Sequence, residues 1–423
     1  GLDEPFDCRP DARRVSDAIL ARSAELNCRL PSRVNIAFGG CSSCRAHARI
    51  NDAGFESRVV DGQAGYRLWA GGSLGTMPAL ALEVVGFLPR AEVVAAAEAL
   101  VDVFVTLGDI AHPKRGRMKF AVERVGADGF RAAFDASFAR GRARCEPAPP
   151  PVETLGAADF SEALAIVPPG GWAEGARPQR TPGRAMVTVN VPLGDLTSDE
   201  MRLLSSLAPT GDGQLHLTRN QNAMFRDVCV ADIPGLRLAL ASHGLSTEGA
   251  DAAGDVRACT GSAVCALGIT AAPAAGARLI GHSALARNSG LRVHVSGCPN
   301  SCAQHQAAAI GLSGATVRIN GEIRLGYHVW LGGDLEAGRL GVLAGRVADD
   351  SVEEAVGAIV GCWEATRAVG ESLPSTVARI GADAFCRHLE AVASGFQTGA
   401  GEAEPPEVSR ALPIGGALTG GVR

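Results

Sequence analysis

Residues 34–44 read Val-Asn-Ile-Ala-Phe-Gly-Gly-Cys-Ser-Ser-Cys, and residues 292–302 read Arg-Val-His-Val-Ser-Gly-Cys-Pro-Asn-Ser-Cys. Both stretches alternate as a β-strand does and then run into a Gly-Cys pair and a second cysteine. Further along, Gly-Tyr-Arg-Leu-Trp-Ala-Gly-Gly-Ser-Leu at residues 65–74 matches Gly-Tyr-His-Val-Trp-Leu-Gly-Gly-Asp-Leu at residues 326–335. The chain therefore contains an internal repeat.

Two further landmarks follow in the same order in both halves. Residues 90–107 and 351–368 each carry Ala, Val and Leu at helical spacing, which predicts an amphipathic helix. Residues 125–130 and 380–385 then each open a short helix with a Gly-Ala-Asp motif. Matching landmarks in one order predict an α+β fold built from two duplicated modules, related by a pseudo-two-fold axis.

The length of 423 residues predicts two or three domains. A Pro-rich stretch between the repeats is typical of an exposed linker, and the Gly- and Glu-Pro-rich end is typical of a disordered tail. Residues 184–247 have the pattern of a small βαβ-type unit with no partner in the first half. The predicted divisions are a first repeat at 1–143, a linker at 144–183, the small unit at 184–247, a second repeat at 248–395 and a tail at 396–423.

The bulk composition sets broad limits on function. A hydrophobic fraction of 46% with 20% charged residues is ordinary for a globular protein. The net charge of −5 gives no reason to expect nucleic acid as a partner, and no apolar run is long enough to predict a membrane span. The 12 cysteines are too sparse for a disulfide scaffold, so without a secretion signal they indicate metal ligands or reactive thiols in the cytoplasm.

Four cysteines of the second half fall into two tight pairs. An iron–sulfur cubane needs four thiolates from short spacings, and small neighbours such as Gly261 and Gly297 let the backbone approach the cluster. Four buried free thiols or a structural zinc site are the alternatives, although zinc sites made only of cysteine favour shorter spacings. The predicted cluster ligands are Cys259, Cys265, Cys298 and Cys302.

The Cys-Thr-Gly-x3-Cys motif at 259–265, followed by Gly-Cys-Pro-Asn-Ser-Cys at 297–302, closely resembles the signature of the siroheme nitrite/sulfite reductase family. The resemblance extends from residue 1 to about residue 395. It implies a [4Fe–4S] cluster, siroheme, a ferredoxin-like half-domain at 184–247, and a second role for Cys302 as the bridge to the siroheme iron. Cys41 and Cys44 occupy the mirror position; we interpret them as a relic of duplication, the alternative being a second cluster.

Siroheme carries many carboxylates and its substrates are anions, so basic and amide side chains are expected beside them. Residues 30–35 resemble the family's Leu-Pro-Arg-Lys-x-Lys/Asn segment, which implies that Arg33 and Asn35 face the substrate from one side of a strand. Arg33 stands where the family has Lys. Asn at position 35 goes with nitrite reductases and Lys with sulfite reductases, so the sequence favours nitrite. Surface positions on an edge strand are the alternative.

Three further segments resemble parts of the family's cofactor site. The basic run 114–119 implies contacts from Arg117 and Lys119 to siroheme carboxylates, although such a run is often a solvated face. The Thr-x-x-Gln-Asn segment implies hydrogen bonds from Gln221 and Asn222 to the macrocycle; as ordinary strand residues they need no such role. Asn300, inside the second cysteine pair, is expected to hydrogen-bond the cluster or the heme.

The resemblance implies a six-electron reduction of nitrite, a small inorganic anion, to ammonia. No Gly-x-Gly-x-x-Gly loop is seen, so a ferredoxin-like partner is the expected electron donor. The family also has a stretch ahead of residue 1 that supplies the other half of the small unit and two substrate arginines. We therefore expect the chain to be a fragment, or its site to be completed by something else.

Three other functions stay open. Assimilatory reduction of sulfite to sulfide uses the same cofactors. A precorrin-3B synthase-like monooxygenase shares the cysteine spacing, but it usually carries Lys-Gly where this chain has Asn300 and Ser301. The third is an electron-transfer or structural iron–sulfur module without catalysis.

Overall fold

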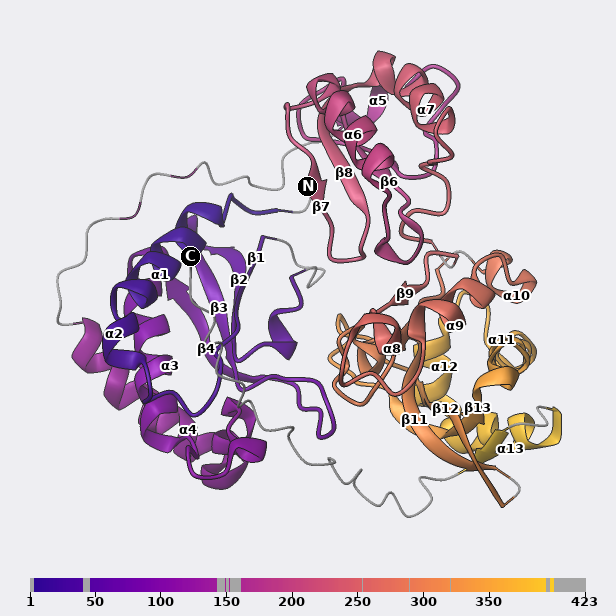
Figure 1. Ribbon diagram of the computed structural model, residues 1–423. Helices are drawn as coiled ribbons and strands as arrows, with labels where there is room; N and C mark the ends of the chain where they lie inside the picture. Colours follow the sequence, from indigo (N-terminus) through magenta and orange to yellow (C-terminus); the bar gives the residue numbers. More distant parts are fainter. Residues whose placement is uncertain are drawn as a thin grey trace, which may run out of the picture.

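The computed structural model describes residues 4–40, 46–142, 149, 152, 161–252, 254–288, 290–319, 321–392 and 396–398. These residues form three sheets, each with a hydrophobic core of its own. Figure 1 shows the three groups of elements in order along the chain, coloured from indigo to yellow. No described helix combines the length and apolar character needed to cross a bilayer.

The first module is a four-stranded sheet in the order β1-β2-β3-β4, covered on one side by helices (Figure 1). Strand β1 pairs parallel with β2, and the other neighbours are antiparallel. Buried aromatic side chains such as Phe55 and Tyr66 fill the space between sheet and helices. The elements are α1 (Arg9–Ala21), α2 (Ser23–Leu26), β1 (Ile36–Gly39), β2 (Ala53–Val60), β3 (Gln63–Ala70), β4 (Leu82–Pro89), α3 (Val93–Leu107) and α4 (Met118–Arg142).

The second module repeats this plan and extends it. Its sheet has the order β14-β13-β12-β11-β10-β9, in which β10 pairs parallel with β9 and β11, and the remaining neighbours are antiparallel. The strands are β9 (Arg257–Ala258), β10 (Val293–Ser296), β11 (Ile310–Ile319), β12 (Glu322–Leu331), β13 (Val342–Ala348) and β14 (Phe396–Thr398). The helices are α8 (Gly261–Val264), α9 (Ala272–Leu279), α10 (Ser283–Ala286), α11 (Val352–Thr366), α12 (Leu373–Ile380) and α13 (Ala382–Val392).

The matching connectivity confirms the predicted α+β duplication. Strands β1 to β4 and β10 to β13 share one order and one pattern of directions, and α3 and α11 lie where the two amphipathic helices were expected. Both modules also break a helix at the same landmark glycine. Gly126 has φ 75° within α4, and Gly381 has φ 80° between α12 and α13. Glycine adopts this left-handed conformation without the steric cost of a side chain.

The small unit is an antiparallel sheet in the order β5-β6-β8-β7, so the expected βαβ pattern is wrong. It extends further toward the amino terminus than predicted, because residues 176–178 of the predicted linker pair with β6 and bury Ala176. Its elements are α5 (Ser161–Ala165), β5 (Ala176–Pro178), β6 (Arg184–Val189), α6 (Ser198–Leu207), β7 (His216–Leu217), β8 (Ala223–Cys229) and α7 (Ile233–Ala241).

The predicted tail also needs a correction at its start. Residues 396–398 form β14, which pairs with β13 and buries Phe396 at 5% exposure. Strand β13 would otherwise present an open edge on this side, and β14 covers this edge at residues 345–347. Residues 399–423 lie outside the described part of the chain.

Candidate functional site: a cavity lined by thiols and cations

The two cysteine pairs meet because β9 and β10 are parallel neighbours. Val295 pairs with Ala258, so both strands end at the same edge of the sheet. Cys259 directly follows β9, and Cys298 lies two residues beyond β10. A cavity of about 500 Å³ opens there, and it is lined by all four thiol residues: Cys259, Cys265, Cys298 and Cys302.

Glycines let the two cysteine loops pack this closely. A Cβ atom on Gly297 would lie 2.6 Å from the Cα of Gly261 and 2.8 Å from the carbonyl oxygen of Thr270, so no larger residue fits without a shift. The backbone N–H of Gly297 also donates a hydrogen bond to Sγ of Cys259 over 3.1 Å. The loops thus offer both the space and the N–H donors that a thiolate-bound cluster requires.

The thiols destabilise one another's charged form. Burial raises the pKa of Cys302, and the three other site cysteines raise it further, whereas Arg33 lowers it. Burial likewise raises the pKa of Cys298, with Cys259 and Cys265 adding to the effect. A cationic iron–sulfur core would relieve this repulsion, because metal-bound thiols are deprotonated.

The separation of the thiols also bears on the zinc alternative. Within the described ranges, no three His, Cys, Asp or Glu side chains converge as the ligands of one metal ion would. The four cysteines line one cavity, and a [4Fe–4S] cluster takes one thiolate on each of its four irons.

The opposite wall of the cavity comes from the first module and is basic. Residues 73–77 approach the cysteine loops, and Gln306 holds this segment by donating a hydrogen bond to the carbonyl oxygen of Gly75 over 2.8 Å. The charged residues that line this wall are Arg33, Lys114, Arg117 and Lys119. The fold therefore places cations of one module opposite thiols of the other.

Two of these cations are held by the protein itself. Arg117 forms a bidentate ion pair with the fully buried Asp52, with Nη2–Oδ2 and Nε–Oδ1 distances of 2.8 and 3.2 Å. Lys119 is buried, and its Nζ donates to the carbonyl oxygens of Leu74 and Met77. Burial, and next the neighbouring Arg117, lowers the pKa of Lys119 to about 8. Both side chains are fixed in direction before any ligand arrives.

The two expected substrate residues have different positions. Both precede β1, which begins at Ile36, and the carbonyl oxygen of Asn35 accepts from the backbone N–H of Ala53 at the start of β2. That they share one face of a strand stays a prediction. Arg33 is exposed and lines the cavity. Asn35 is not among the residues that line the cavity, and its backbone N–H donates to Oδ2 of Asp52 over 2.9 Å. The buried carboxylate thus ties Asn35 to Arg117.

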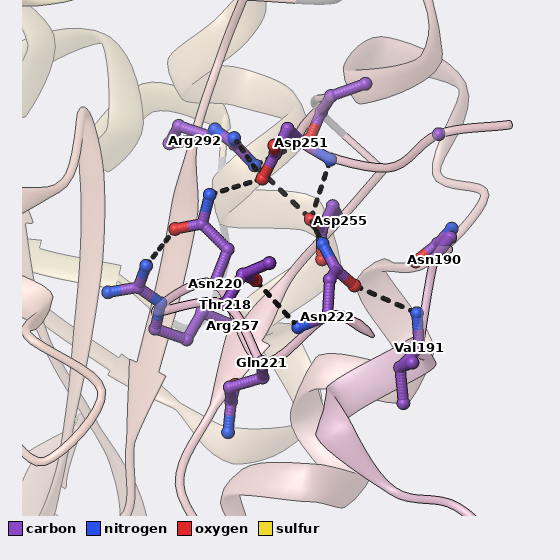
Figure 2. A network of polar contacts seen from close by, with 12 residues as sticks. Asn190, Val191, Thr218, Asn220, Gln221, Asn222, Asp251, Asp255, Arg257 and Arg292 are labelled. Carbon is purple, nitrogen blue, oxygen red and sulfur yellow. Dashed lines mark hydrogen bonds and ion pairs between the residues drawn. The ribbon is translucent and has the colours of Figure 1, made fainter. Parts of the chain in front are cut away.

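Gln221 and Asn222 use their amides inside the protein, as Figure 2 shows for Asn222. Gln221 pairs with the backbone of Ala258, donating from Nε2 over 2.8 Å and accepting at Oε1 over 3.2 Å. Asn222 accepts from the backbone N–H of Val191 and donates to Asp255. Hydrogen bonds from these amides to a macrocycle stay a prediction. The contacts of Gln221 attach the small unit to the residue before Cys259, and Asn222 attaches it to Asp255.

Asn300 and the mirror cysteines complete the predicted set. Asn300 is exposed and lines the cavity between Cys298 and Cys302. Cys41 and Cys44 lie outside the described residues, so neither their interpretation as a relic nor a second cluster is tested.

Comparisons with known proteins agree with this geometry. Residues 2–140 and 250–395 match the nitrite and sulphite reductase 4Fe-4S domain, and residues 177–243 match the nitrite/sulfite reductase ferredoxin-like half domain. The chain belongs to the nitrite and sulfite reductase family. Both expected cofactors of the family, a [4Fe–4S] cluster and siroheme, are thereby confirmed.

Individual relatives include both kinds of reductase. A ferredoxin–nitrite reductase of Synechococcus elongatus is 30% identical over 79% of this chain and 64% of its own length. A sulfite reductase [NADPH] hemoprotein beta-component of Acidithiobacillus ferrooxidans is 29% identical over 76% of this chain and 56% of its own length. The chain thus spans less than two thirds of these relatives.

A solved structure supports the fold. The NirA protein of Mycobacterium tuberculosis superposes with a TM-score of 0.71 over 91% of this chain and 69% of its own length, at 24% sequence identity. At this identity the likeness shows the shared fold alone.

Sequence reasoning missed the residues that hold the site together. Asp52 and Gln306 carry no motif, and their partners lie far away in the chain. One signal could have indicated the 73–77 wall: the repeat's Gly71-Gly72 pair marks a turn where the chain changes direction.

Proposed function

We propose that this chain is the catalytic part of a siroheme- and [4Fe–4S]-dependent reductase that converts nitrite to ammonia with six electrons. The observation that carries the proposal is the single cavity in which the four thiols face cations of the other module. The names of relatives add support, since several are ferredoxin–nitrite reductases.

Each side chain of the cavity has a proposed role. The four cysteines would hold the cluster, and Cys302 would also bind the siroheme iron, as the family resemblance implies. When bound, these groups supply one-electron transfer to the substrate. Arg33 is the exposed cation close to Cys302, so its guanidinium would orient the anion and stabilise negative charge there.

The basic wall would bind the carboxylates of siroheme. Lys114 is exposed at the cavity, whereas Arg117 and Lys119 are fixed by their internal partners. With a pKa of about 8, the Nζ of Lys119 can also hold and release a proton near neutral pH. Asn300 would hydrogen-bond the cluster or the heme from the cysteine loop.

Asn35 favours nitrite over sulfite. A lysine at this position would add a positive charge near Arg117 and Asp52, which suits a more highly charged anion. Sulfite remains the second candidate, because a sulfite reductase component is among the relatives. For the donor we propose a ferredoxin-like protein. Such proteins are usually acidic, so a basic surface close to the cluster should receive it.

The proposal includes the cytoplasm as the compartment. Thiols that hold an iron–sulfur cluster need a reducing environment, and all nine cysteines in the described residues are free.

The test uses the protein produced together with the enzymes of siroheme synthesis and purified without oxygen. We expect siroheme absorption bands, and turnover of nitrite exceeding that of sulfite with reduced methyl viologen as donor. Absence of siroheme from the full-length protein would refute the proposal. Oxygen-dependent hydroxylation of a precorrin without nitrite turnover would instead favour the monooxygenase.

A variant pair tests the substrate preference. Asn35→Lys should raise sulfite turnover relative to nitrite. Asn27→Lys adds the same charge at an exposed position of the first module and should leave the ratio unchanged. An unchanged ratio in both variants would remove the reason for preferring nitrite.

A further inference from the structure

A second cavity, of about 520 Å³, lies where all three parts of the chain meet. His47 lines it from the first module, Arg219 from the small unit, and Arg257, Arg292 and His294 from the second module. None of the four site cysteines lines this cavity. We propose that it is a second anion-binding site, for a small ligand that presents a phosphate or carboxylate group.

Arg257 is the centre of the proposed site. It is only 5% exposed, and its two terminal nitrogens donate to neutral amide oxygens, Nη1 to Gln304 over 2.7 Å and Nη2 to Asn220. Figure 2 shows the contact with Asn220. In the described part of the chain, Nε of Arg257 has no hydrogen-bond partner and no carboxylate lies within ion-pair distance. A buried charge with only neutral partners is costly, and an anion would relieve this cost.

Charges of both signs act on this guanidinium. Burial lowers the pKa of Arg257 to about 10, the charges of Arg219 and Arg292 lower it next, and Asp255 and Asp251 counteract them. Arg292 is partly compensated, because Asp251 and Asp255 lie 3.5 and 3.6 Å away. The cluster thus keeps positive charge in a partly dry space, which favours an anionic ligand.

Two histidines add neutral polar groups. His47 is 8% exposed, and burial followed by the charges of Arg219 and Arg257 lowers its pKa to about 3. Its Nδ1 has no partner among the described residues. Nδ1 of His294 lies 3.2 Å from the carbonyl oxygen of Gln304, which orients that ring. His47 therefore offers an unused ring nitrogen that can donate to a bound oxygen.

The acidic residues of the lining do not cancel this charge. Asp334 pairs with Arg339 over 3.3 Å, and Glu371 pairs with Arg379 over 2.7 Å. Glu336 is exposed at the rim. The acids therefore leave the central guanidinium available to a ligand.

The internal repeat explains why a second cavity exists. The thiol cavity is lined by residues 73–77 of the first module, and this cavity is lined by residues 334–336 of the second, which match residues 73–75 in the repeat. Each cavity is also lined by a residue that follows the matching strand, Cys298 after β10 for the thiol cavity and His47 after β1 for this one. Duplication thus produced two related cavities, one with four thiols and the other with arginines.

The experiment measures binding of inorganic phosphate and of oxalate to the cluster-loaded full chain by isothermal titration calorimetry in low-chloride buffer. We expect saturable binding of at least one of these anions at one site. Arg219→Gln should weaken the binding of the anion about tenfold or more, because a charged hydrogen bond is lost. Arg257→Lys should weaken it by a similar factor, because lysine cannot make the bidentate contact of a guanidinium.

Two controls locate the site. Arg202→Gln removes an exposed arginine of the same small unit, paired with Asp199, and should leave the affinity unchanged. Arg33→Gln should also leave it unchanged, because Arg33 lines the thiol cavity. Arg219 is exposed, so its variant should fold even if Arg257→Lys does not. The proposal is overturned if neither anion binds, if Arg219→Gln binds as the parent does, or if only Arg33→Gln abolishes binding.

Discussion

The contact between Gln221 and Ala258 makes a specific prediction about the cluster. Gln221→Met keeps the length of the side chain but removes both hydrogen bonds to the backbone of Ala258. Ala258 is 2% exposed and directly precedes Cys259, so water cannot replace the lost partner. We expect the variant to be less stable and to retain less iron, because the first cysteine loop loses its attachment to the small unit.

The magnitude follows from the two groups left unpaired. A buried backbone N–H or C=O without a partner costs about 1–3 kcal/mol, so the two groups together should cost roughly 2–6 kcal/mol. For a unit of this size, each 1 kcal/mol lowers the melting temperature by about 2–4 °C. A decrease of roughly 4–24 °C is therefore expected for the transition of the second module.

Thermal unfolding followed by circular dichroism, with iron and sulfide determined per chain, provides the assay. Gln214→Ala is the matched control, because Gln214 is an exposed glutamine of the same small unit. The reasoning is refuted if Gln221→Met melts within about 1 °C of the control and retains the same iron content.

Three further predictions concern the walls of the cavity. Asp52→Asn breaks the buried ion pair with Arg117 and should lower the free energy of unfolding by about 3 kcal/mol in urea titrations; a change near zero contradicts this. The folded chain lowers the pKa of Lys119 from 10.5 to about 8, so the unfolded chain binds more protons in this range and stability should rise with pH across it. Lys119→Met should remove that rise in urea titrations at several pH values. Gly297→Ala should reduce the iron content, because the added Cβ would meet the other cysteine loop. Gly361→Ala is the control, since a Cβ there would meet no atom within 4 Å. Equal iron content in the two variants would contradict the close packing of the cysteine loops.

The duplication and the cysteine loops could be predicted because their signals are local. The repeat gives two similar strand patterns, and short spacings place two thiols on each loop. Parallel pairing of β9 with β10 then brings the loops together at one edge. The meeting of the four cysteines could thus be predicted, because each strand and loop involved lies within a few residues of a cysteine.

The errors concern short strands at sheet edges. β5 and β14 have three residues each, too few for an alternating pattern to be recognised. The residues that flank these two strands in the sequence are of the kinds typical of linkers and tails. Pairing with a neighbouring strand of the sheet decides their conformation, β5 with β6 and β14 with β13.

The polar framework could not be predicted because its partners lie far apart in the chain. Asp52 and Arg117 are separated by 65 positions, and Gln221 and Ala258 by 37. No short motif encodes such contacts. A resemblance to family segments identified Arg117 and Gln221 as candidates, but only the folded chain shows which atoms their side chains bind.

Mössbauer spectroscopy of the iron-57-enriched, anaerobically purified protein tests the central claim most directly. We predict the spectrum of a four-iron cluster, its loss in Cys265→Ser, and its retention in Cys28→Ser, which changes an exposed cysteine away from the cavity. An iron-free protein with four reduced thiols, or a single bound zinc ion in their place, would contradict the account.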